Sequence, residues 1–451
     1  MPENDAMTFV TFRLRAAGLA LLCALTGTRV FAQAAPAAAD TPGAAAAPAS
    51  DWRFNGFGTL AAVDAFPRDG WGFRRELTQP EHHDTANTFA TDSRLGFQAD
   101  WRPDAQWELV GQLVFKPRAH DASLEETVAW AFAAWRPSPD WTIRAGRTSP
   151  DLFLLADARN VGFAYPWMRP SVEFYGWMPL STVDGLDATR EWHLGDAHVA
   201  AKLFAGRSHF TLASAHDNGD ENGTTDPLMG GTLTADANGL TFKATFAEAR
   251  TRPANAKHID ELHAGLDGLA ALPIPVIAAQ AAALRDTFPV GTLFTRYSAV
   301  AVAWSVDPWQ VQAELSRITG NFIASQDWYG YASVAYRVGN VTPFAMFGRA
   351  RSSRAPLASP NWTQALTPIL GPQNAALAQY AGADIADTYN IGREDQRSVS
   401  LGARWDVAAQ VALKLQVDAI HSAPYGGGMW AFDTLSAHHA VVVSAGMDFV
   451  F

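Results

Sequence analysis

The chain has 451 residues, a formal net charge of −11 and one cysteine, so an internal disulfide and a thiolate metal cluster are excluded. The negative charge and the lack of a basic patch on any exposed stretch argue against nucleic acid as a partner. Beyond residue 32 no run of about 20 apolar residues occurs, which is the length that a transmembrane helix needs. Aromatic residues still make up 11% of the chain, and tryptophan alone numbers 16.

The first 32 residues have the features of an export signal. Arg13 and Arg15 supply a positive start, and residues 16–25 form an apolar stretch that is too short to span a bilayer as a helix. We expect cleavage after Ala32, with Ala34 nearly as good a site. A short N-terminal membrane anchor is the alternative interpretation.

Residues 33–50 are rich in alanine and proline and cannot form a core, so we expect a periplasmic linker there. The remaining residues, 51–451, contain segments in which apolar and polar side chains alternate. We therefore expect three parts, namely a leader (1–32), a linker (33–50) and a folded β-domain (51–451).

The last segment shows the alternation most clearly. Phe451, Phe449 and Met447 lie on one face of the expected strand, whereas Asp448 and Ser444 lie on the other. In water, such an apolar face needs a second protein layer to cover it. In a bilayer, lipid covers it.

The same alternation and the turns between segments predict sixteen strands, with 14 or 18 as the open alternatives. Seven short polar turns alternate with long polar connections, which is typical of bacterial membrane barrels. The expected strands span approximately residues 52–63, 91–102, 107–117, 126–136, 141–148, 184–194, 197–206, 228–236, 239–251, 291–305, 308–320, 326–338, 341–352, 395–406, 410–423 and 438–451.

Seven tryptophans lie beside the short turns, where an aromatic girdle would meet the lipid head groups. They are Trp101, Trp107, Trp135, Trp141, Trp304, Trp309 and Trp405. A soluble β-protein has no reason to place core tryptophans next to turns, so this placement favours a membrane barrel.

With its leader, its alternating strands and its terminal Phe451, the chain resembles the sixteen-stranded Gram-negative outer-membrane porins. The resemblance implies an all-β transmembrane antiparallel barrel with a long third loop folded into the lumen. It implies passive diffusion of small hydrophilic solutes, and contact with outer-membrane lipid and lipopolysaccharide. It also implies reading of Phe451 by the barrel-assembly machinery and a homotrimer. No cofactor, metal or enzymatic activity is expected.

The third long connection, about residues 149–183, is unusually rich in aromatic side chains for an exposed loop. Its position matches the constriction loop of porins, with Arg159 and Arg169 expected to face the barrel wall. The expected constriction residues are Asp151, Asp157, Arg159, Tyr165, Trp167, Arg169 and Glu173. A loop that latches a neighbouring subunit or covers the mouth is the alternative.

The alternation also places more bases than acids on the inward face. The expected basic wall residues are Arg53, Arg94, Arg102, Lys116, Arg144, Lys202, Lys243, Arg404 and Lys414, against Asp100, Glu108, Glu314, Asp418 and Asp448. A basic wall favours anions, so we expect a mild anion preference, for small carboxylates or phosphate. If the wall charges pair with one another, the pore is instead nearly unselective. The alternation does not decide which face of the strand carries Arg349 and Arg351, so neither is assigned to the inward wall.

Two further loops, residues 255–286 and 361–390, are expected to be partly helical, and either to gate the mouth or to pack on each other outside the lumen. The acidic run 217–226 is interpreted as a solvated loop tip because it lacks the ligand spacing of a calcium loop. Two other functions remain open: a non-conducting barrel that acts as an adhesin or structural protein, and an outer-membrane hydrolase. The histidines, among them His82 and His83, form no recognisable catalytic motif.

Overall fold

The computed structural model describes residues 51–79, 85–118, 124–212, 221–253, 256–287, 291–321, 327–427, 429–431 and 436–451. All of them belong to the unit Asp40–Phe451. The predicted leader (1–32), the linker (33–50) and the pair His82 and His83 lie outside the described residues.

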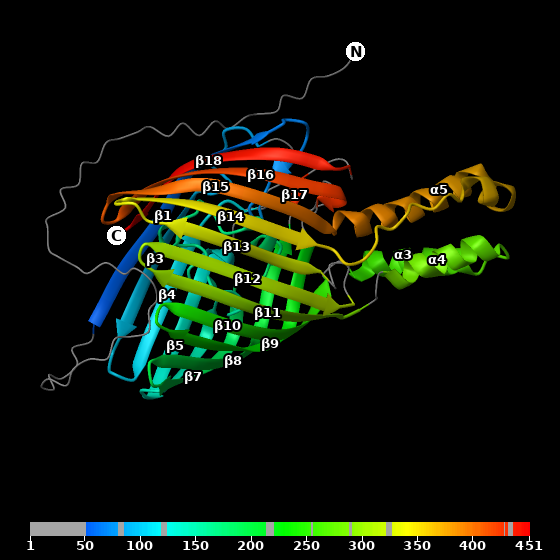
Figure 1. The fold of residues 1–451 in the computed structure, drawn as a ribbon. Helices are drawn as coiled ribbons and strands as arrows, with labels where there is room; N and C mark the ends of the chain where they lie inside the picture. Colours follow the sequence, from blue (N-terminus) through cyan, green and yellow to red (C-terminus); the bar gives the residue numbers. More distant parts are fainter. Residues whose placement is uncertain are drawn as a thin grey trace, which may run out of the picture. The chain divides into compact units, whose positions relative to one another are not determined.

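Sixteen antiparallel strands form a closed barrel (Figure 1). In chain order they are β1 (Asp51–Phe66), β3 (Arg94–Arg102), β4 (Trp107–Phe115), β5 (Val128–Ser138), β6 (Trp141–Thr148), β7 (Val183–Leu194), β8 (Ala197–Leu212), β9 (Glu221–Ala237), β10 (Leu240–Pro253), β11 (Leu293–Val306), β12 (Trp309–Gly320), β13 (Trp328–Tyr336), β14 (Val341–Arg351), β15 (Glu394–Ala408), β16 (Val411–Gly427) and β18 (His438–Val450). The predicted fold class and strand number are confirmed.

Pairing of the first and last strands closes the barrel. Phe57 lies opposite Val450, and the pairing continues in register to Phe66 and Val441. Beyond β18, the backbone of Phe451 still exchanges hydrogen bonds with Gly56, at 2.8 and 2.9 Å. Closure leaves no unpaired strand edge, which the interior of a bilayer would not tolerate.

The strands alternate between an outward apolar face and an inward polar face. Large apolar side chains are exposed along the outside, such as Phe54 (73%), Leu203 (72%) and Leu401 (59%). Inward neighbours on the same strands, such as Thr59 and Ser400, are buried. The period of two therefore turns one side of every strand outward, and the outward apolar belt is the surface that lipid would cover.

The tryptophans beside the short turns lie on the outside of the barrel. Trp107 and Trp135 are 43% and 38% exposed, and their rings stack with centroids 6.1 Å apart. Trp101 stacks in the same way on Trp52, at 5.5 Å. These pairs form part of an aromatic girdle at the short-turn end, where the chain also ends, as Figure 1 shows.

Tight turns at this end follow from local chemistry. The turn between β9 and β10 consists of Asn238 and Gly239, with φ of 51° and 77°. A two-residue hairpin loop of this kind requires positive φ at both positions, which Asn-Gly adopts at the least cost.

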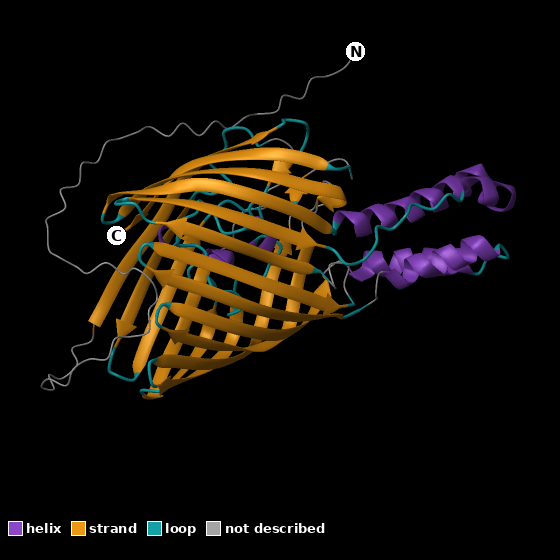
Figure 2. Cartoon of the chain, in the orientation of Figure 1, coloured by secondary structure: helices purple, strands orange, loops and turns teal. Residues whose placement is uncertain are grey.

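The long connections carry the remaining elements. They are β2 (Gly72–Phe73), α1 (Leu124–Thr127), the 3₁₀ helix η1 (Gly162–Ala164), α2 (Val172–Tyr175), α3 (Ala256–Ala270), α4 (Pro275–Thr287), α5 (Thr363–Ile391) and β17 (Trp430–Ala431). Figure 2 shows α3, α4 and α5 beyond the long-loop end of the barrel. No described helix has the length and hydropathy needed to cross a bilayer.

The two helical loops pack on each other. Leu284 of α4 and Leu366 of α5 belong to one apolar cluster, and Trp362 Nε1 donates to Gln280 Oε1 at 2.7 Å. One prediction needs correction: the acidic run 217–226 is not wholly a loop tip, because its part from Glu221 onward belongs to β9. The strand predicted at 228–236 therefore begins seven residues earlier, at Glu221.

Candidate functional site

Residues 149–182, between β6 and β7, form a connection that we call loop 3, and it packs inside the ring of strands. Phe153, Trp167 and Phe174 are only 1%, 2% and 0% exposed. Trp177 of loop 3 stacks on Tyr329 of β13, with ring centroids 4.4 Å apart. Burial of these rings against the wall explains why a connecting loop carries so many aromatic residues.

The apolar packing of loop 3 is one-sided. The inward-facing wall members of this cluster lie on β1, β8 to β14, β16 and β18, and include Val63, Phe204, Leu228, Tyr297, Ile318, Tyr331, Phe344, Ile420 and Val442. Among the described residues, β3 to β6 contribute none, and β7 contributes only Val183. The apolar cluster of loop 3 is therefore attached to one part of the wall and does not extend over β3 to β6, whose inward faces are mixed: β5 turns Trp130, Phe132 and Ala134 inward.

Wall bases hold the loop backbone in place. Lys414 Nζ donates to the carbonyl oxygens of Gly162, Tyr165 and Trp167 at 2.7 Å each, and pairs with Asp448 at 2.8 Å. Because the charge of Lys414 is neutralised by Asp448 and shielded by three carbonyls, this residue anchors loop 3 and adds no free charge to the lumen.

Arg94 and Arg404 act on the same stretch of loop. Arg94 Nε donates to the carbonyl oxygen of Asn160 at 2.6 Å, and its Nη2 donates to Tyr165 Oη at 2.8 Å. Arg404 Nη1 donates to the carbonyl oxygen of Phe163 at 2.6 Å. Lys414, Arg94 and Arg404, all predicted wall bases, thus bind the backbone or a ring hydroxyl group of loop 3 directly.

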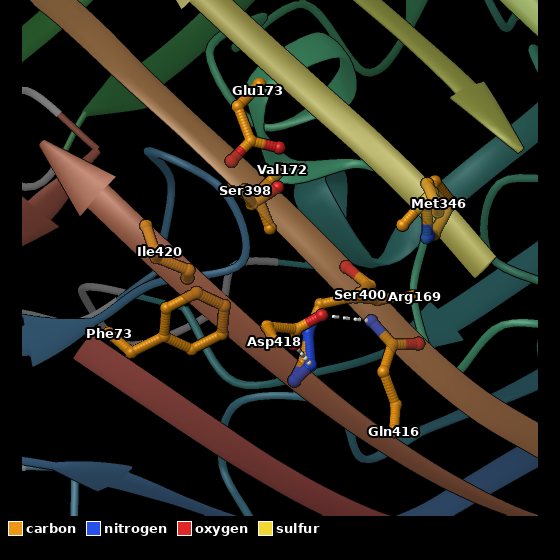
Figure 3. Close-up of a pocket in the computed structure, with 11 residues that line it drawn as sticks. Phe73, Arg169, Val172, Glu173, Met346, Ser398, Ser400, Gln416, Asp418 and Ile420 are labelled. Atoms are coloured by element: carbon orange, nitrogen blue, oxygen red, sulfur yellow. Dashed lines mark hydrogen bonds and ion pairs between the residues drawn. The ribbon is translucent and has the colours of Figure 1, made fainter. Parts of the chain in front are cut away.

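Arg169 and Glu173 are the most buried charged residues of loop 3, each at 1% exposure. The Arg169 guanidinium lies 3.4 Å from Asp92 and 3.5 Å from Asp418, donates to Ser444 at 3.0 Å, and lies over the ring of Phe73. Figure 3 shows Arg169 beside Asp418, with Phe73 nearby. One arginine therefore links loop 3 to the first loop and to two wall strands.

Glu173, in α2 of loop 3, also contacts the wall. It accepts hydrogen bonds from Ser171 and from Gln396 of β15, both at 2.8 Å, and Trp430 Nε1 of the last loop donates to Gln396 at 2.7 Å. Between this group and the wall lies a small cavity, lined by both polar and apolar side chains, with room for about one water molecule (Figure 3). It has no space for a solute.

The first loop also folds inward, and its Glu76 joins loop 3 to the wall. Lys116 forms an ion pair with Glu76, and Arg159 lies 3.7 Å from the same carboxylate. Burial acts to raise the pKa of Glu76, but Lys116, Arg159 and Arg75 outweigh it and hold the pKa well below its usual range. Glu76 is therefore a permanent anion between two close cations.

A second carboxylate with two cations lies at Asp151, at the start of loop 3. Lys202 of β8 lies 2.8 Å from it, and Lys243 of β10 forms the other ion pair. Burial acts to raise the pKa of Asp151, but the two lysines prevail and lower it well below its usual range.

Glu108 forms the third such group, near the short-turn end of β4. Arg102 and Arg136 bind its two oxygens at 2.8 and 2.5 Å. Each of the three groups contains one carboxylate and two cations, so each carries a net charge of +1.

Arg144 of β6 and Asp157 of loop 3 are two further charged residues near Lys202. Arg144 is paired with Asp187 at 2.9 Å. Asp157 of loop 3 is exposed and lies within electrostatic range of Arg144 and Lys202. An exposed acid on the loop thus faces bases on the wall.

The seven predicted constriction residues thus separate into a buried group and a group at the polar wall. Tyr165, Trp167, Arg169 and Glu173 are buried, whereas Asp151, Asp157 and Arg159 lie on the polar side. Arg159 contacts Glu76 of the first loop, not the wall as expected. Eight of the nine expected wall bases make the contacts described above, whereas the Arg53 side chain is 51% exposed at the end of β1 and pairs with Asp51 at 3.2 Å.

Sequence reasoning missed the first loop, although Trp71, Phe73, Arg75 and Glu76 form a dense aromatic and charged stretch that could have signalled it. Asp92, which pairs with Arg169, was missed because the expected strand 91–102 included it, whereas β3 begins at Arg94.

The described residues offer no group of three or more His, Cys, Asp or Glu side chains that could hold a metal. His421 and His439 form a pair on the outside of the barrel, with Nδ1 atoms 3.2 Å apart. Phe451 is 56% exposed at the short-turn end.

Comparisons with known proteins give structural likeness only. No family model matches the chain, and no curated protein matches it. Among solved structures, OmpF of Salmonella typhi in complex with daunomycin has 12% identity and a TM-score of 0.49, covering 89% of this chain and 98% of its own. An anion-selective porin from Comamonas acidovorans has 10% identity and a TM-score of 0.49, covering 89% and 100%.

The outer-membrane channel DcaP of Acinetobacter baumannii has 12% identity and a TM-score of 0.47, covering 89% of this chain and 97% of its own. Because these identities and scores are low, the fold assignment rests on the strand pairing of this chain itself.

Proposed function

We propose that this protein is a porin-type outer-membrane channel for passive diffusion of small hydrophilic solutes. The observation that carries the proposal is a closed barrel of sixteen strands with an apolar outside and a charged inside. Only a surrounding lipid phase covers such an outer face without a further protein layer.

The proposed path runs between loop 3 and the inward faces of β3 to β8. On this side the charged side chains are partly exposed: Arg144, Lys202 and Asp151 each retain 16%. On the opposite side, aromatic residues fill the space between loop 3 and the wall. In this proposal loop 3 is a constriction element attached mainly to the arc of strands that runs from β8 round to β1.

The charge balance along this path supports a mild preference for anions such as small carboxylates or phosphate. The groups around Glu76, Asp151 and Glu108 each have two cations for one carboxylate. Asp157 and Asp100 offset part of this excess. Ion pairing in the wall therefore reduces the selectivity without abolishing it.

The remaining parts of the proposal concern export and assembly. The leader (1–32) directs export, the linker (33–50) remains in the periplasm, and Phe451 is read by the barrel-assembly machinery. The barrel lies among outer-membrane lipid and lipopolysaccharide, and a homotrimer is the proposed assembly. Cross-linking of the protein in native membranes tests for the trimer.

A non-conducting barrel that acts as an adhesin is the second candidate. Two observations favour it: the lumen contains a packed aromatic cluster, and α3, α4 and α5 form a helical structure with a core of their own. An outer-membrane hydrolase has no comparable support from the described residues.

Planar bilayers distinguish the two candidates. A channel gives stepwise conductance that is absent from blank detergent, and under a salt gradient its reversal potential has the sign of anion preference. Absence of steps from correctly folded protein overturns the channel proposal. Conductance with a reversal potential of zero retains the channel and overturns the anion preference.

A further inference from the structure

Four neighbouring strands carry a row of basic side chains on the outside of the barrel. Arg349 of β14 lies opposite Arg397 of β15, which lies opposite His421 of β16, which in turn lies opposite His439 of β18. Strand spacing makes this row about 14 Å wide. We call these four residues the outer basic row.

The parity of the strands turns the row outward. Arg397 has the same parity as Val399 and Leu401 of its strand, which are 50% and 59% exposed. His439 has the same parity as Val441, which is 43% exposed. The row is thus continuous with the apolar belt and does not belong to the lumen.

The row lies at the long-loop end of the barrel. Arg349 is two residues before the last residue of β14, and His439 is the second residue of β18. From the row toward the short turns, the outward residues of β15 are Val399, Leu401, Ala403 and Trp405. The basic row therefore lies where lipid tails give way to head groups.

The chain itself supplies little countercharge to the row. Directly opposed like charges destabilise a sheet, and in the described part of the chain Asp395 is the one acid in ion-pair distance, 2.5 Å from Arg349. His421 and His439 have their Nδ1 atoms 3.2 Å apart, which requires an unprotonated nitrogen on one ring. An external anion would relieve this repulsion and allow both rings to be protonated.

The basic patch extends beyond the row. Arg351 of β14 and Arg317 of β12 both lie opposite Trp328, and the Arg317 guanidinium lies over the Trp328 ring at 5.2 Å. At the short-turn end, Arg190 instead lies between Trp141 and Trp192, at 5.4 and 5.2 Å from their rings. Both ends thus place an outward arginine on tryptophan rings, and what distinguishes the long-loop end is the row of adjacent bases on four strands.

We propose that the outer basic row binds the phosphate groups of a phosphorylated glycolipid of the lipid A type in the outer leaflet. Guanidinium groups bind phosphate in a bidentate manner, and a row about 14 Å wide accommodates more than one phosphate of a single headgroup. The inference rests on the proposed membrane location of the barrel and is independent of conduction.

The test uses full-length protein in nonionic detergent, titrated with bis-phosphorylated lipid A. We expect Arg349→Gln/Arg397→Gln to bind roughly 30-fold more weakly, because each arginine at an anionic membrane surface changes the affinity about fivefold. The matched control is Arg190→Gln, an outward arginine at the other end, and it is expected to bind as the parent does. Conductance of the same samples reports separately on the channel proposal.

Three results would overturn the inference: equal binding by the double variant and Arg190→Gln, equally tight binding of phosphatidylglycerol, or equally tight binding of dephosphorylated lipid A. Tight binding of inorganic phosphate alone would assign the row to free phosphate and would also overturn it. If the double variant does not fold, Arg397→Gln alone is expected to bind about fivefold more weakly, and Arg397→Lys to recover part of the loss.

Discussion

Replacement of Arg169 by methionine is expected to release loop 3 from the wall. The substitution keeps an apolar chain of similar length but leaves Asp92 and Asp418, with side chains 0% and 6% exposed, without their shared cation. Removal of one partner from a buried ion pair costs about 3–5 kcal/mol. The contact of Arg75 with Asp92, at 3.9 Å, is too long to compensate.

This cost falls on docking of the loop, because strand pairing does not depend on Arg169. A loss of 3–5 kcal/mol changes the ratio of docked to released loop roughly a hundredfold or more. The expected result is a larger and noisier single-channel conductance, with faster proteolysis of loop 3 and unchanged heat resistance of the barrel.

The matched control is Arg285→Met, which removes an arginine paired with Asp267 on the exposed helical hairpin. It is expected to leave conductance and proteolysis unchanged. If Arg169→Met also leaves both unchanged, the anchoring role of Arg169 is wrong.

Three further outcomes are expected. Glu108→Gln leaves two arginines without their carboxylate, so the reversal potential should shift toward stronger anion preference. A cysteine at Thr189, inward on β7, should react with a charged thiol reagent and reduce conductance, whereas a cysteine at the buried Ser400 should not react. The pKa values of Glu76 and Asp151 are lowered in the folded protein, so the stability that they contribute is fully present above the unfolded value of about 4 and disappears only as pH falls through the lower folded value. Hydrogen-exchange protection of the first loop and loop 3 should therefore be the same at pH 7 and pH 4, and should fall only in stronger acid.

Controls make these outcomes decisive. Glu248→Gln removes an outward acid of β10 and should not shift the reversal potential. Equal reactivity of the two cysteines would contradict the one-sided path. Loss of loop protection between pH 7 and pH 4 would mean that Glu76 and Asp151 do not hold the loops as described. A single cysteine in the parent chain, Cys23 of the predicted leader, simplifies the labelling experiment.

The strands could be predicted because each carries its own signal. A side chain's face in a strand depends only on its parity, so Leu401 and Ser400 reveal their environments without knowledge of any partner. The turns are equally local, as Asn238 and Gly239 show. Strand ends were less certain: β9 extends through the acidic residues from Glu221, because pairing with β8 outweighs their low strand propensity.

The interior could not be predicted in the same way. The sequence indicated that loop 3 holds aromatic and charged residues, but Arg169 meets Asp92, Asp418 and Ser444 only because the closed barrel brings four separate segments together. Arg349 had no assigned face until the pairing of β14 with β15 turned it outward.

The sequence by itself determined the alternation and the position of the short turns, since these follow from interactions between near neighbours and from the contrast between lipid and water. It predicted sixteen strands but left 14 and 18 open, and the pairing of β1 with β18 decided the number. The tertiary structure alone decided which wall bases bind loop carbonyls, which share a carboxylate and which face the lipid. Those choices depend on distances between residues far apart in the chain, and closure of the barrel sets these distances.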